Sequence, residues 1–181
     1  MQAKLKKISL IASMGVLAAT SQFAHAAGTG QITFNGKLIA DTCTINAGDA
    51  AKTVTLPTVS AKSLAASGNT AGSTMFTLSV TNCPATLSNV AAHFETDNMD
   101  QATHAAKNQA TTTPATNVVV QLLDKDGTTA IGLGSAGSYV AINGIGDARG
   151  ATMNYGGRYL ATGAAEAGNV MAVVRYTLAY N

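Results

Sequence analysis

The sequence predicts an all-β sandwich. Three observations predict it: apolar and polar residues alternate with a period of two along much of the chain, these runs are short and separated by turns rich in Gly, Asn and Asp, and helical patterns are scarce. Many short strands joined by such turns are typical of two packed sheets. The length of 181 residues allows one domain of this kind, or two very small ones.

Residues 1–26 predict a secretory signal peptide that precedes the first strand. Lys4, Lys6 and Lys7 form a positive region, an apolar stretch follows over residues 8–19, and Ala24-His25-Ala26 is a small-x-small cleavage site. The stretch is shorter than the about 20 residues that span a bilayer. No later segment reaches that length, so we expect no membrane insertion of the mature chain. Removal takes away three of the 11 basic residues and none of the 9 acidic ones, which changes the net charge from +2 to −1.

The strands are predicted in order from the alternating runs. They cover residues 31–38, 75–80, 90–94, 117–123, a short strand after a tight turn at Asp126-Gly127, residues 155–161, and the last twelve residues. The pair Gly156-Gly157 predicts a bulge or bend in its strand. Residues 60–64 predict one short helical turn, and residues 102–116 a loop. The last run places six residues on one face: Val170, Ala172, Val174, Tyr176, Leu178 and Tyr180.

The two cysteines, Cys43 and Cys83, predict a disulfide bond, because an exported chain meets an oxidising compartment. Closing a loop of about 40 residues stabilises a fold by roughly 4 kcal/mol in the chain-entropy model. Two free thiols are the alternative. A metal site is disfavoured, because the cysteines have neither C-x-x-C nor Cys/His spacing.

Composition and motifs argue against several functions. The balance of 11 basic and 9 acidic residues is too even for a nucleic-acid-binding surface. Residues 132–137 match G-x-G-x-x-G, but a strand-like run follows where a dinucleotide site needs a helix, so we expect a turn. Residues 124–127 lack the acids of a calcium loop. His93 and His104 stand without a nucleophile motif. We therefore expect no enzyme activity, no catalytic residue, no cofactor and no metal.

The two ends of the exported chain are the most informative part. Residues 27–38 precede the first cysteine and lie outside the disulfide loop, and twelve extended residues reach about 40 Å. The run 168–181 is apolar on one face and stops at the chain end. Ordinary pairing within one closed sandwich would account for both.

The chain resembles the major structural pilins of chaperone–usher fimbriae, close to the type 1 fimbrial subunit. The order and spacing of several features carry the resemblance. Near the start they are residues 30–38 followed by Cys43, the segment Leu56-Pro57-Thr58-Val59, and the two cysteines. Later in the chain they are residues 117–127, residues 158–163, and an alternating last strand with Gly168 fourteenth from the end and Tyr180 penultimate. The resemblance covers nearly all of the mature chain. The Ala/Thr-rich loop at 102–116 departs from it.

The resemblance implies an incomplete immunoglobulin-like sandwich, the pilin fold, completed by a donated strand. It divides the chain into a signal peptide (1–26), a donor-strand extension (27–38) and a pilin domain (39–181). The donor residues would be Ile32, Phe34, Gly36 and Leu38. The groove that receives a strand from a neighbour or a chaperone would be lined by Gly168, Val174, Tyr176, Leu178 and Tyr180.

The function implied is that of a structural subunit of a fimbria, with three kinds of partner: neighbouring subunits in a homopolymer, a periplasmic chaperone and an outer-membrane usher. The chain would pass through the periplasm to the cell surface. The alternative is a secreted carbohydrate-binding sandwich or a fimbrial tip adhesin. The absence of Trp and the presence of a donor extension disfavour it.

Overall fold

The computed structural model describes residues 31–39 and 41–181; the predicted signal peptide (1–26) and residues 27–30 of the predicted donor extension lie outside the described residues. The chain divides between Lys37 and Leu38 into two units, each described by itself. In the first, residues 31–37 form no strand and are exposed. The strand predicted there has no partner among the described residues of its unit, and an unpaired strand leaves its backbone groups to water.

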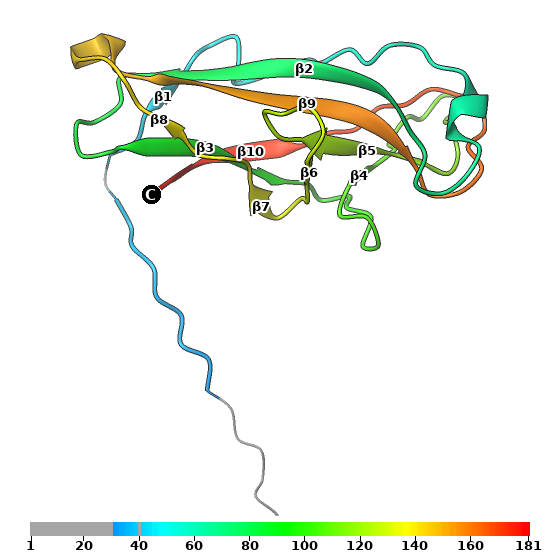
Figure 1. The fold of residues 1–181 in the computed structure, drawn as a ribbon, viewed down its shortest axis with the longest axis horizontal. Coiled ribbons are helices and arrows are strands. Elements are labelled where there is room, and N and C mark those ends of the chain that lie inside the picture. The colour runs from blue at the N-terminus through cyan, green and yellow to red at the C-terminus, as the bar shows by residue number, and fades with distance from the viewer. Residues whose placement is uncertain (1–30, 40) are drawn as a thin grey trace, which may run out of the picture. The chain divides into compact units, whose positions relative to one another are not determined.

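The second unit is a sandwich of two antiparallel sheets, as predicted (Figure 1). The first sheet has the order β1-β2-β9-β5-β4, with β6 also paired to β5; the second has the order β10-β3-β7, with β8 also paired to β3. The elements are β1 (Thr44–Ile45), η1 (Ala61–Leu64), β2 (Thr70–Thr81), β3 (Asn89–Glu95), β4 (Ala106–Lys107), β5 (Val118–Leu123), β6 (Ala130–Ile131), β7 (Ser135–Ala136), β8 (Val140–Ala141), η2 (Gly146–Ala148), β9 (Ala151–Ala161) and β10 (Arg175–Tyr180).

The core lies between the sheets, and Tyr155 of β9 occupies its centre. The ring is 1% exposed and packs edge-on against Phe94 of β3 with 4.9 Å between centroids. Its hydroxyl accepts a hydrogen bond of 2.9 Å from the Ala92 amide. A buried tyrosine needs such a partner for its polar tip. This side chain therefore fixes β9 of one sheet against β3 of the other.

The disulfide predicted between Cys43 and Cys83 is present. It joins the residue before β1 to the loop after β2, so it fastens the start of the sandwich to its longest strand. Both cysteines are buried in the main core cluster. Among the described residues, no helix is long and apolar enough to cross a membrane.

Most of the predicted elements are confirmed. Besides the strand predicted at residues 31–38, which does not form, three predictions differ from the structure. The helical turn is η1, capped by the Ser60 hydroxyl. The bulge expected at Gly156-Gly157 is in β2 instead: β9 pairs regularly with β5, while the register of β2 shifts between Ala71 and Thr74, where Gly72 has a φ of +66°. The loop at 102–116 contains the short strand β4, and the last strand begins at Arg175 rather than at residue 170.

The first glycine of the pair in β9, Gly156, is explained by packing rather than by a bend. A Cβ on Gly156 would lie 2.8 Å from the sulfur of Met75 and 3.2 Å from Cβ of Leu123. A larger residue at this position would displace the Met75 side chain and crowd Leu123, so the packing favours glycine here.

Candidate functional site

One edge of the second sheet is unpaired among the described residues. β10 pairs with β3 on one side only, in a register from Arg175 opposite Glu95 to Tyr180 opposite Val90. The six residues before β10, 169–174, are not part of a strand. The backbone carbonyls of residues 169, 171 and 173 accept hydrogen bonds on the side of the chain that, within β10, faces β3. In an extended chain the N–H and C=O of alternate residues point to opposite sides. The even-numbered residues from 170 to 180 therefore direct their backbone groups away from β3.

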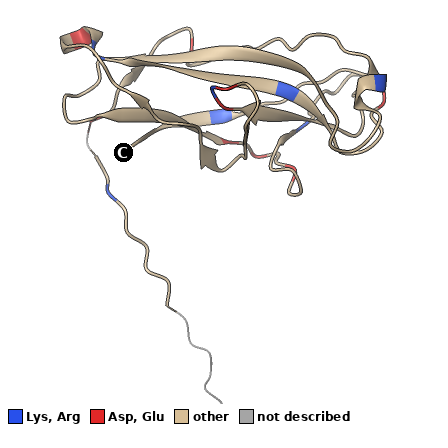
Figure 2. Ribbon diagram, viewed as in Figure 1, with Lys and Arg blue, Asp and Glu red and all other residues tan. Residues whose placement is uncertain are grey.

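The same even-numbered residues carry apolar side chains on the face toward the core. Val170, Ala172, Val174, Tyr176, Leu178 and Tyr180 are all half-buried and pack against the core clusters, as the sequence predicts for this face. β10 carries one charged residue, Arg175, and few charges lie along the ribbon of the sandwich as a whole (Figure 2). The exposed Arg175 side chain pairs with Asp97. We call residues 170–180 the accepting edge. Its apolar side chains are only partly covered, and its backbone groups on the side away from β3 can form hydrogen bonds to another strand.

A second extended stretch faces this edge. Residues 51–59, the facing segment, belong to no strand and make no backbone–backbone hydrogen bond to any described residue. Val54, Leu56 and Val59 are half-buried, while most of their neighbours are exposed. The Leu56 side chain lies against β9, since a Cβ on Gly157 would be 3.7 Å from it. The facing segment thus covers the first sheet with its side chains and leaves its own backbone unpaired.

Three contacts place the accepting edge opposite residues 42–59 along its length. The Tyr180 hydroxyl accepts a hydrogen bond of 3.0 Å from the Cys43 amide and also contacts the Thr42 hydroxyl. The Tyr176 hydroxyl donates to the Asp49 carbonyl at 3.0 Å. At the far end, Val170 and Val59 pack against the same small cluster of buried residues. The two stretches therefore run beside each other at the boundary between the sheets.

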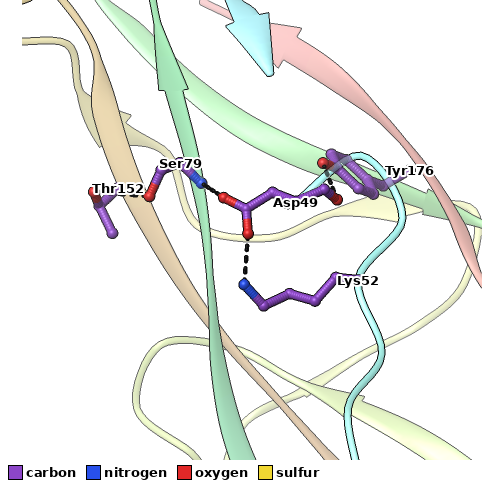
Figure 3. Close-up of polar contacts among 5 residues, drawn as sticks. All are labelled: Asp49, Lys52, Ser79, Thr152 and Tyr176. Carbon is purple, nitrogen blue, oxygen red and sulfur yellow. Dashed lines mark hydrogen bonds and ion pairs between the residues drawn. The ribbon is translucent and has the colours of Figure 1, made fainter. Parts of the chain in front are cut away.

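Asp49 anchors the loop before the facing segment (Figure 3). Its side chain is the one buried polar or charged group in the described core, with 7% of the residue exposed. One carboxylate oxygen accepts from the Ser79 amide of β2 at 2.8 Å, and the other pairs with the Lys52 ammonium. The hydrogen bond from Lys52 lowers the pKa of Asp49 below its ordinary value, and the Ser79 amide adds to this although burial opposes it. Sequence analysis missed Asp49, because an isolated acid among small residues gives no periodic signal.

The predicted donor residues are exposed in the single chain. Ile32 is 79% exposed, Phe34 89% and Leu38 100%, and a Cβ on Gly36 would meet nothing within 4 Å. Apolar side chains of this size normally find cover in the fold that contains them. Their arrangement leaves the predicted donor surface available to another molecule.

Of the residues predicted for the groove, Val174, Tyr176, Leu178 and Tyr180 belong to the accepting edge, and Gly168 lies just before it. A Cβ on Gly168 would be 2.4 Å from the Ala115 amide and 2.6 Å from the Thr113 carbonyl oxygen. The close approach of the 113–115 backbone therefore requires glycine at this position. Gly168 is exposed and not on the half-buried face.

The two histidines are placed apart. His93 is on β3 with its Nε2 3.4 Å from Glu95, and His104 lies in an exposed loop with a φ of +52°. No group of three metal-ligating side chains occurs in the part of the chain that the structure describes. The turn predicted over residues 132–137 is present at residues 133–134, and strand β7 follows it at Ser135–Ala136.

Comparisons with known proteins point to one family. The family model described as Type-1 fimbrial protein, A, matches residues 56–181. The chain is 44% identical to the F17 fimbrial protein of Escherichia coli over 97% of this chain and 99% of that protein. It is 41% identical to the major fimbrial subunit SMF-1 of Stenotrophomonas maltophilia, over 92% of this chain and all of that protein.

Solved structures show the same fold. A Burkholderia pseudomallei antigen and type I fimbria protein superposes with a TM-score of 0.55 at 29% identity, over 77% of this chain and 90% of that one. The P pilus rod subunit PapA superposes with a TM-score of 0.60 at 16% identity, over 78% of this chain and all of that one. These likenesses confirm the predicted fold class, an incomplete immunoglobulin-like sandwich of the pilin type.

Proposed function

The chain belongs to the type-1 fimbrial protein family of non-enzymatic structural subunits of surface fimbriae, and from this premise we propose that its copies polymerise by donating a strand to one another. The observation that most directly supports this proposal is that the facing segment lies beside the accepting edge. Both are extended, and both present half-buried apolar side chains. Among the described residues, the accepting edge has no strand partner on the side away from β3, and the facing segment has no strand partner on either side. A strand inserted between them would satisfy both backbones and cover the core.

The donor is residues 31–38 of a second copy. Its apolar positions, Ile32, Phe34 and Leu38, alternate with polar ones, so an inserted strand would turn them together toward the core. Gly36 interrupts this row, and we propose that it lies where the floor of the site is shallow. Every pairing between the labelled strands of this molecule is antiparallel. We therefore expect the donor to run antiparallel to β10, with Leu38 near Val170 and Ile32 toward the chain end.

Donation of this kind builds a filament. The donor and the accepting edge are different surfaces, so each added copy uses one and presents the other. Such head-to-tail contacts propagate unless the rotation between copies closes a ring. Repetition of this contact between donor and accepting edge gives a homopolymer of identical subunits.

Before assembly the accepting edge needs cover, because an uncovered apolar sheet edge invites aggregation. We propose that a periplasmic chaperone lends a strand to this edge, and that the donor of the next subunit replaces it at an outer-membrane usher. Strand addition between chaperone and pilin is a known mode of recognition, and the accepting edge has the backbone and side chains that it requires. The exported route agrees with the predicted signal peptide.

Deletion of residues 27–38 tests the proposal. The shortened chain should keep its chaperone complex and form no polymer, measured by size-exclusion chromatography with light scattering and by electron microscopy. The matched control replaces Thr33, Asn35 and Lys37 by Ala, which keeps the length and the apolar row and should polymerise. Polymers of normal length from the deletion variant would refute the proposal.

The chaperone contact is tested at Tyr180. Replacement by Asn removes the ring that packs on the core and contacts Cys43, so less subunit should survive in the periplasm. An unchanged amount of chaperone complex, measured by co-purification, would contradict this use of the accepting edge.

A further inference from the structure

The accepting edge extends beyond the strand that supports it. β3 ends at Glu95, opposite Arg175, so residues 169–174 have no pairing with it. The connection between β3 and β5, which contains the short strand β4 and is called the loop below, takes its place on the same side. Residues of this loop bond the odd-numbered positions: the Thr96 hydroxyl donates to the Val173 carbonyl at 2.8 Å, the Gln109 amide to the Met171 carbonyl at 2.7 Å and the Ala115 amide to the Asn169 carbonyl at 2.9 Å.

Asn108 is the residue that joins these contacts. Its Oδ1 accepts from the amides of Ala110 and Met171, both at 3.0 Å. Its Nδ2 donates to the carbonyls of Ala115 at 3.0 Å and Asn169 at 2.8 Å. All four bonds go to backbone groups, two on residues 169–171 and two on the loop. The side-chain amide uses two donor hydrogens and two acceptor positions, which is its ordinary full capacity.

The extension matters for the length of a donated strand. β10 spans about 17 Å, whereas a strand from Ile32 to Leu38 spans about 20 Å at 3.3 Å per residue. On its core-facing side β10 also offers three half-buried positions, Tyr176, Leu178 and Tyr180, whereas the donor presents four inward positions. At least one donor position must therefore be received before Arg175, on the part that the loop supports.

We propose that Asn108 is a positioning residue that holds residues 169–171 extended and so completes the accepting edge for the Leu38 end of a donated strand. The proposal rests on the function proposed above. Asn108 does not contact the donor itself; it acts through the backbone of Asn169 and Met171. Without it, the loop and the chain end lose the bonds that keep them in register, and Leu38 loses the surface against which it packs.

The test uses the exported chain, residues 27–181, and a fluorescent peptide of residues 27–39, with binding measured by fluorescence anisotropy. In every variant tested, the chain's own extension carries Phe34→Ala, so that it competes weakly with the peptide; the chain with an unaltered accepting edge is called unchanged. Asn108→Ala should weaken binding of the peptide about tenfold. This expectation follows because the variant loses much of the affinity that burial of the Leu38 side chain contributes. The matched control is Asn98→Ala, in the same loop, whose side chain bonds none of residues 169–173; it should bind like the unchanged chain.

Peptide variants locate the effect. With the Leu38→Ala peptide, the Asn108→Ala chain and the unchanged chain should bind equally, which also shows that the variant is folded. With the Ile32→Ala peptide the tenfold difference should remain. The inference would be overturned if the difference in affinity between the two chains disappeared with the Ile32→Ala peptide instead. It would also be overturned if the difference remained with both peptide variants.

The two proposals fail separately. If the peptide does not bind the unchanged chain, the proposed function is wrong and this inference falls with it. If it binds, and the Asn108→Ala chain binds it as tightly, this inference alone is wrong. Should Asn108→Ala fail to fold, Asn169→Ala replaces it, since this exposed side chain fastens the same loop through the Thr112 carbonyl at 2.8 Å. The same coupling to Leu38 is then expected, and its absence would overturn the inference.

Discussion

Replacing Phe34 by Ala should separate the stability of a subunit from its ability to donate a strand. The ring is 89% exposed in the single chain, so its removal takes little from the fold. Exposed substitutions away from caps and networks change the free energy of unfolding by about 0.5 kcal/mol or less. We expect the denaturation midpoint of the Phe34→Ala chain to match that of the unchanged one.

The effect on donation should be large. If Phe34 enters the core of a neighbouring subunit, the substitution removes the burial of the ring and leaves a cavity. Losses for Phe to Ala in well-packed sites are about 3 to 5 kcal/mol. Taking about 3 kcal/mol, the dissociation constant of the donor should rise roughly a hundredfold, since each 1.4 kcal/mol is tenfold.

The assay compares peptides of residues 27–39 in binding to the exported chain by anisotropy, and compares the full chains in urea denaturation. Asn35→Ala is the matched control, because an alternating strand turns this neighbour away from the core; it should bind within about twofold of the unchanged peptide. Equal affinity of the Phe34→Ala and unchanged peptides would refute the reasoning. So would a loss of more than about 1 kcal/mol in the stability of the chain alone.

Three further predictions concern the sandwich. Tyr176→Phe removes the hydrogen bond to the Asp49 carbonyl and should lower the free energy of unfolding by about 1 kcal/mol in urea denaturation; no change would show that this bond contributes nothing. The fold lowers the pKa of Asp49 below 3.8, so the stabilisation is complete above that pH and is lost as the pH falls through the lowered value. Asp49→Asn should therefore destabilise the chain at pH 7 and much less at pH 2, and equal losses would contradict this. Replacing Cys43 and Cys83 by Ser should lower stability by roughly 4 kcal/mol, as expected for a loop closed over 40 residues; a loss below about 1 kcal/mol in calorimetry would argue against the chain-entropy account.

The strands that the sequence predicts well are those with local alternation. Residues 75–80 and 90–94 lie within β2 and β3, and the apolar face of residues 170–180 is half-buried as the period of two requires. Such patterns are local, because the side chains of a strand alternate whatever its partner is. The bulge was misplaced because Gly156-Gly157 and Gly72 give the same signal, and only the packing of Met75 against Gly156 distinguishes them.

The sequence by itself determined the all-β class and the alternating runs at both ends of the chain, because these depend on the order of residue types along a strand. It also predicted the disulfide bond. Only the tertiary structure decided that the last run has an unpaired edge, that residues 51–59 lie opposite it, and that Asp49 and Asn108 fasten the loops around it. These depend on residues far apart in the chain: Asn108 meets Asn169 across 61 positions, and Asp49 meets Tyr176 across 127. A single polar side chain gives no period, so its partner becomes known only when the sheets have packed.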